Sequence, residues 1–178
     1  MIIAREQRKV LDLSTLFSWF IIYSYIGWIY ETTYCSVNAG KFVNRGFLYG
    51  PICPIYGVVI LLMILLLTDR CKSTLSLFLS CGLVASGWEY MSSYIMETIF
   101  GRRWWNYSNK PFNINGRICL GAALLFGVSG VLIVRYLHPA VVRYLENNFT
   151  DRMIRKANKV IFAIFLCDVL ASIRISIS

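Results

Sequence analysis

Acidic side chains stand inside strongly apolar stretches of this chain. Glu31 follows GWIY, Glu89 lies within GWEY, and Glu97 comes two helical turns later. Asp168, in the last apolar stretch, belongs to the same class. A charge near the centre of a bilayer is costly unless it is paired or faces water, so such residues mark ion pairs, relays or binding sites.

Arginines in the polar connections are natural partners for these acids, because a guanidinium forms bidentate bonds with carboxylates and phosphates. We therefore predict a polar site between two halves of the chain that binds an anionic or zwitterionic group. Its candidate residues are Glu31, Arg45, Glu89, Glu97, Arg102, Trp104, Asn115 and Arg117. Two alternatives stay open: ion pairs that serve only packing, and an ordinary interfacial belt of arginines and aromatic residues.

Metal and catalytic motifs are missing from the sequence. The six cysteines form no CxxC pair, and His138 is the single histidine, so we predict no metal and no cofactor. GxSxG, P-loop and HExxH motifs do not occur. An enzyme, for example one that modifies lipids in the same pocket, is therefore less favoured than a binding or transport protein.

The composition predicts a membrane protein. Hydrophobic residues make up 57% of the 178 residues, charged residues 15%, and the mean hydropathy is +0.60. A helix needs about 20 predominantly apolar residues to span a bilayer. Five stretches meet this approximately: Leu13 to Tyr34, Pro51 to Thr68, Thr74 to Phe100, Ile118 to Leu137 and Asn158 to Ile177.

An internal repeat organises these stretches. GWIYETTY at positions 27–34 returns as GWEYMSSY at 87–94, and each copy is followed by a polar loop and another apolar stretch. We predict an all-α polytopic fold of about five spans in a single membrane domain, 1–178. It comprises two parallel helix-loop-helix repeats, at about 13–68 and 74–137. An amphipathic interfacial helix, His138 to Lys159, and a C-terminal span follow.

The basic residues predict orientation and partners. Lys and Arg are more numerous on the side that holds the N-terminus, where Arg5, Arg8 and Lys9 lie, so we expect this side to be cytoplasmic. The formal net charge is +9, but the cations flank the apolar stretches. This placement favours anionic lipid headgroups over nucleic acid as partners. A scaffold that recruits a soluble partner through the cationic interfacial helix is a further alternative.

The order of motifs resembles one known family. GWIYE, FVNRGFLYGPICPIYG, RWWNYS, PFNINGRICL and HP follow one another as in the type IV, CmpB-like ABC-transporter permease family of small bacterial membrane proteins. The resemblance runs from about Phe17 to Pro139. It implies about five spans and the membrane part of an uptake or export system. A permease of this kind would need a separate ATPase chain and more than one copy to form a pore.

Overall fold

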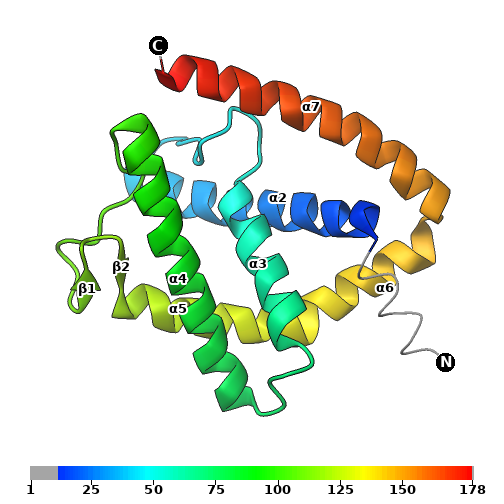
Figure 1. Ribbon diagram of the computed structural model, residues 1–178, viewed down its shortest axis with the longest axis horizontal. Helices are drawn as coiled ribbons and strands as arrows, with labels where there is room; N and C mark the ends of the chain where they lie inside the picture. The colour runs from blue at the N-terminus through cyan, green and yellow to red at the C-terminus, as the bar shows by residue number, and fades with distance from the viewer. Residues whose placement is uncertain (1–11, 178) are drawn as a thin grey trace. The chain divides into compact units, whose positions relative to one another are not determined.

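The computed structural model describes residues 12–177, which are helical apart from their connections and one short hairpin (Figure 1). The α-helices are α2 (Leu13–Ala39), α3 (Pro54–Leu67), α4 (Thr74–Phe100), α5 (Leu120–Leu132), α6 (His138–Asn148) and α7 (Asp151–Ile177). A π-helical turn, η1 (Ile133–Leu137), joins α5 to α6, and the strands β1 (Asn113–Ile114) and β2 (Ile118–Cys119) pair antiparallel. Arg5, Arg8 and Lys9 lie outside the described residues.

The chain divides into two compact units. One runs up to Leu61 and resumes at Leu145, and the other is Leu62–Tyr144. The first unit contains α2, most of α3 and α7, and the second contains α4, the hairpin, α5 and η1.

A long helix followed by a short one occurs in both units. α2 and α4 each have 27 residues, whereas α3 has 14 and α5 has 13. Both long helices begin at a side-chain cap, Asp12 or Ser73, which accepts a backbone N–H of the first turn. Both end at a left-handed glycine, Gly40 with φ 64° and Gly101 with φ 66°.

Two glycines let α3 approach α2 closely. A Cβ built on Gly27 would lie 2.3 Å from Cγ of Tyr56, and one on Gly57 would lie 2.1 Å from Oγ of Ser24. Helices in lipid pack through such small residues because these allow close backbone contact. Gly27 and Gly57 therefore fix where α3 crosses α2.

α7 packs along α2 in the same direction, as Figure 1 shows. Asn158 donates to the carbonyl of Ser14 at 2.7 Å near the start of both helices. Further along, Phe162 packs edge-on against Phe17, and Phe165 packs edge-on against Phe20, each at a centroid distance of 5.6 Å. Both the polar and the aromatic contacts hold α7 to this unit.

Glycines also allow close packing between α4 and α5 in the second unit. A Cβ on Gly127 would lie 2.7 Å from the ring of Phe78, and one on Gly130 would lie 2.5 Å from Cβ of Cys81. Cys81 is fully buried at this contact. The short helix of each unit is thus seated on the long one through glycine.

The helical fold class is confirmed, but the predicted count of five spans is not. Among residues 12–177, two helices are long and apolar enough to cross a membrane, Leu13–Ala39 and Leu120–Asn148, the latter being α5, η1 and α6 in continuation. Pro54–Leu67 is apolar but shorter. α7 begins at Asp151, seven residues before the predicted last span. Its extra turns carry charged side chains.

The predicted interfacial helix from His138 to Lys159 is wrong as a single element. α6 continues η1 without a break, because the π turn offers an i→i−5 bond, from His138 N–H to the carbonyl of Ile133, just before Pro139 removes a donor. The chain breaks at Phe149–Thr150 instead, and the Thr150 hydroxyl accepts the N–H of Met153 at 3.4 Å. The amphipathic sequence is therefore shared between α6 and α7.

Candidate functional site

The connection between α2 and α3, residues 40–53, folds back along α2, and we call it the first return loop. Val43 N–H donates to Ser36 Oγ at 2.9 Å and Arg45 N–H donates to Thr32 Oγ1 at 3.3 Å. At the far end of the loop, the N–H of Cys53 donates to the carbonyl of Ser24 at 3.0 Å. The loop thus descends from Ala39 to Ser24, which corresponds to about 22 Å of helix.

Glu31 and Arg45 form an ion pair at the middle of this descent. Nη2 of Arg45 lies 2.9 Å from Oε1 of Glu31, and Nε lies 3.2 Å from the same oxygen. The side chains are 26% and 21% exposed, so the pair is shielded without being sealed from solvent. Sγ of Cys53 lies 3.8 Å from Oε2 of Glu31, the second oxygen of the same carboxylate.

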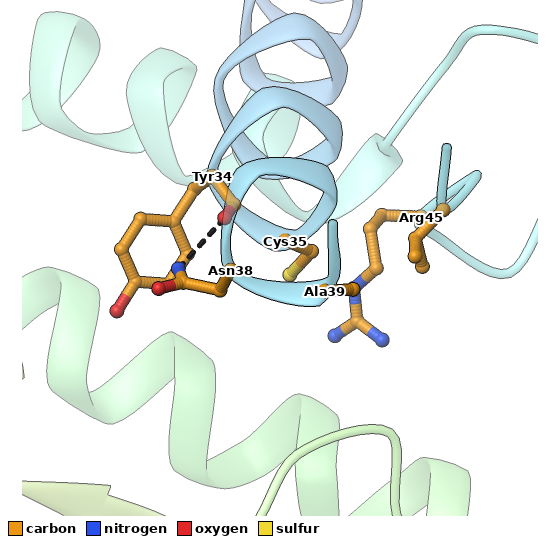
Figure 2. Close-up of a pocket in the computed structure, with 6 residues that line it drawn as sticks. Tyr34, Cys35, Asn38, Ala39 and Arg45 are labelled. Carbon is orange, nitrogen blue, oxygen red and sulfur yellow. Dashed lines mark hydrogen bonds between the residues drawn. The ribbon is translucent and has the colours of Figure 1, made fainter. Parts of the chain in front are cut away.

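A cavity of about 440 Å³ opens beside the pair (Figure 2). Its helical wall comes from the last turns of α2 and its loop wall from the first return loop; the lining residues are Tyr34, Cys35, Asn38, Ala39, Val43 and Arg45. The Asn38 amide donates to the carbonyl of Tyr34 at 2.7 Å. Only Arg45 brings a full charge, so the cavity can hold a small group that combines apolar contact with a negative charge.

The connection between α4 and α5, residues 101–119, is the second return loop and also contacts the last turns of α4. Its Tyr107 hydroxyl donates to Oε1 of Glu89 at 3.0 Å, and Asn115 donates to the hydroxyl of Tyr90 at 2.9 Å. Asn115 has φ 53°, in the left-handed region that Asn tolerates better than most residues. Gly116, with φ 67°, continues this left-handed turn, and Arg117 follows it and contacts α4.

Arg117 is the most enclosed charge of the second unit, at 8% exposure. Its guanidinium donates to Ser93 Oγ at 3.0 Å and to Oε2 of Glu97, and it lies over the rings of Tyr90 and Tyr94 at 5.7 and 5.4 Å. Arg103 binds the other oxygen of Glu97 at 2.9 Å. These contacts engage the guanidinium from several sides, which is typical of a group that fixes structure.

Arg102 and Trp104, also predicted for the site, contact each other. The guanidinium carbon of Arg102 lies 4.7 Å from the centroid of the Trp104 ring, a cation–π geometry. Arg102 is exposed and Trp104 is half-buried. The two residues belong to the surface of the second return loop.

The predicted residues thus form two sets. Glu31 and Arg45 pair in the first unit, and Glu97 and Arg117 pair in the second. A single site shared between the predicted repeats stays a prediction. Tyr107 and Ser93 are not among the predicted site residues, although Tyr107 bonds to Glu89 and Ser93 accepts from Arg117; Ser93 lies on the same helical stripe as Glu89 and Glu97, which was the available signal.

Asp168 contacts the first return loop, which the sequence analysis did not predict. Its Oδ1 accepts the N–H of Tyr49 at 3.0 Å, and its Oδ2 accepts the N–H of Gly50 at 2.9 Å. The hydroxyl of Ser172 adds a third bond at 3.2 Å. A charge inside an apolar stretch was the available signal, and α7 uses that charge to hold the loop that carries Arg45.

One comparison with known proteins gives a match. The model of the family described as "Putative ABC-transporter type IV" matches residues 18–173, which include both return loops. No curated protein and no solved structure matches the chain.

Proposed function

The chain belongs to the family described as putative ABC-transporter type IV, and on that basis we propose that it is a membrane component of a transport system. We propose further that the cavity beside Glu31 and Arg45 recognises an anionic or zwitterionic solute. The observation that carries this proposal is the descent of the first return loop along α2, which brings Arg45 to Glu31 next to an open cavity.

The length of α2 sets the depth of this pair. A span takes about 20 residues, and every stretch of that length within Leu13–Ala39 contains both Ser24 and Glu31. If α2 crosses the bilayer, the Glu31–Arg45 pair therefore lies at membrane depth. There, removal of either charge would leave the other uncompensated in a medium of low dielectric constant.

Irregular backbone at membrane depth supports a transport role. Lipid cannot satisfy free N–H and C=O groups, so non-helical segments occur there only where protein buries them or where they line a water-filled cavity. Secondary transporters place their binding sites at such interrupted helices. The first return loop meets both conditions, since it is bonded to α2 and lines a cavity.

Arg45 is a better candidate for solute contact than Arg117. Arg117 is 8% exposed and is held by Ser93, Glu97 and two tyrosine rings. Arg45 lines the cavity. We therefore assign recognition to the first unit and a structural role to the ion pairs of the second.

Cys35 allows the cavity to be tested without knowing the solute, because it lines the same cavity as Arg45. Purified protein in mild detergent is treated with methanethiosulfonate reagents that carry either a sulfonate or a trimethylammonium group, and mass spectrometry reads each cysteine. Arg45 should favour the sulfonate reagent at Cys35 several-fold, since a charge lining the same cavity contributes on the order of 1 kcal/mol at an intermediate dielectric constant. Arg45→Gln should abolish this preference.

Cys71 serves as the internal control, because it lies in the connection between α3 and α4. The ratio of the two reagents at Cys71 should be the same in both proteins. An unreactive Cys35, or a charge preference at Cys35 that survives Arg45→Gln, would contradict the proposed site.

An associated ATPase is tested separately. The chain has no P-loop, so nucleotide hydrolysis would come from another chain. Crosslinking in membranes followed by purification and mass spectrometry should recover an ATPase at a fixed ratio to this protein. Recovery of this chain alone, under conditions that preserve known transporter complexes, would contradict the ABC assignment.

Contact with lipid headgroups is a second candidate function, carried by the surface of the second return loop. Arg102 stacked on Trp104 combines a cation with a flat aromatic face, a pairing suited to headgroup depth. Phospholipid that co-purifies at a fixed ratio and is lost in Arg102→Gln would support it.

A further inference from the structure

A cationic stripe covers one face of the first third of α7. Its four members are exposed and occupy positions i, i+3, i+4 and i+7, which places them on one side of the helix; they are Arg152, Arg155, Lys156 and Lys159. Within residues 12–177, no side-chain hydrogen bond or ion pair joins any of them to another group. The described part of the chain therefore provides no partner for these four charges.

The stripe does not stabilise α7 itself. The N-terminus of a helix carries a partial positive charge, so cations in the first turns are unfavourable there and acids are favourable. α7 has one acid in its first turn, Asp151. Helix stability thus does not explain the four cations.

The exposed surface of α7 changes from cationic to apolar directly after the stripe. Val160 is 61% exposed and Ile164 is 64% exposed, and Leu170 further along is 60% exposed. The stripe rises about 10 Å along the helix, which is similar to the thickness of one headgroup layer. A helix that is cationic over this length and apolar afterwards matches the passage from headgroups to hydrocarbon.

The start of α7 is fixed beside the start of α2. Asn158, between the third and fourth stripe residues in sequence, donates to the carbonyl of Ser14 at 2.7 Å and to its hydroxyl at 2.8 Å. The stripe therefore lies level with the N-terminal end of a helix that can cross a membrane. Anionic lipids of the cytoplasmic leaflet attract basic segments at this depth.

We propose that the stripe is a binding site for anionic phospholipid headgroups in the leaflet where α2 and α7 begin. Phosphate oxygens accept hydrogen bonds from the two arginines and two lysines, and the apolar surface that follows contacts the acyl chains. The proposal does not depend on solute recognition at Arg45, because the two features lie at opposite ends of α2.

The test is retention of phosphatidylglycerol against phosphatidylcholine by the purified full chain, measured by native mass spectrometry. The variant changes Arg152, Arg155, Lys156 and Lys159 to Gln. The matched control changes four exposed cations of other segments, Lys41, Arg70, Lys72 and Lys110, to Gln, which alters the net charge equally. Each stripe cation should contribute up to about fivefold to phosphatidylglycerol affinity, the equivalent of about 1 kcal/mol.

The expected result is a loss of phosphatidylglycerol retention of at least tenfold in the stripe variant, with retention within twofold of the original in the control. Equal losses in both variants would show that net charge alone is responsible and would overturn the proposal. Unchanged retention in the stripe variant would also overturn it, as would loss of a bound soluble protein with lipid retention intact. The unfolding temperature of each variant verifies that the fold is kept.

Discussion

Replacement of Gly57 by alanine tests the closest contact in the first unit. The added Cβ would lie 2.1 Å from Oγ of Ser24 and 2.6 Å from the carbonyl oxygen of Phe20. Rotation of the serine can relieve the first contact. The second involves helix backbone, so only movement of α3 away from α2 can relieve it.

The loss of stability in Gly57→Ala follows from this movement. A carbon-to-oxygen contact of ordinary length requires a retreat of roughly 0.5–1 Å, and overpacking of this kind costs about 1–3 kcal/mol. For a chain of this size, 1 kcal/mol lowers the unfolding temperature by about 2–4 °C. We therefore expect Gly57→Ala to lower it by about 2–12 °C.

A thiol-reactive fluorophore provides the assay, because the buried Cys53 and Cys81 react only after unfolding. Gly87→Ala is the matched control, since a Cβ at Gly87, within α4, meets nothing within 4 Å. Alanine there should be neutral or stabilise the helix by up to about 1 kcal/mol.

A second substitution, Ser24→Ala, shows which of the two contacts destabilises Gly57→Ala. Ser24→Ala in the Gly57→Ala background removes the hydroxyl contact but leaves the carbonyl of Phe20, so it should recover only part of the lost stability. Equal unfolding temperatures for Gly57→Ala and Gly87→Ala would refute the close approach of α3 to α2. Full recovery by Ser24→Ala would refute the role of the backbone contact.

Three further changes test the ion pair, the loop anchor and one thiol. Glu31→Gln or Arg45→Gln alone should destabilise the protein by about 2 kcal/mol, less than the roughly 3–5 kcal/mol of a fully buried pair, and the double change should recover part of this loss in thermal unfolding. Asp168→Asn replaces one oxygen that accepts a loop N–H by a donor, and should cost about 1–3 kcal/mol. Hydrogen bonds from serine hydroxyls, Ser80 first, lower the pKa of Cys71, so iodoacetamide should alkylate Cys71 faster than an ordinary thiol near neutral pH, and Ser80→Ala should slow the reaction.

Each of these has a matched control. Additive effects of Glu31→Gln and Arg45→Gln would show that the two residues do not interact. Asp69→Asn, at an exposed aspartate between α3 and α4, should leave the unfolding temperature unchanged, and an equal effect at both aspartates would contradict the anchor. Cys167 is the exposed reference thiol, and an alkylation rate at Cys71 that follows the pH as at Cys167 would contradict the lowered pKa.

The sequence predicted the long helices and the pairing of acids with arginines. Glu31 with Arg45 and Glu97 with Arg117 were both in the predicted set, because a charge in an apolar stretch needs a partner and few are in reach. The path of the return loops was not predictable in the same way. It depends on the close approach at Gly27 and on backbone bonds such as that from Cys53 to Ser24, which local sequence does not reveal.

Two other features depend on tertiary contacts. Asp168 was recognised as an unusual charge, but its partners are backbone groups of a loop more than a hundred residues away, and every residue offers such groups. The break between α6 and α7 falls at Thr150 because the π turn before Pro139 lets α5 continue into α6. A prediction that ends the helix just before Pro139 therefore places the break before α6, whereas the structure has it after α6.

The shortness of α3 has a consequence for how the protein is made. Its 14 residues rise about 21 Å, less than the roughly 30 Å of hydrocarbon, so this segment is too short to be inserted as an independent span. If α2 is inserted as a membrane span, we expect α3 to leave the insertion machinery together with α2, whose Gly27 and Ser24 contact it. A variant that weakens this contact would then also be lost at biogenesis, as protein degraded before it reaches its mature form.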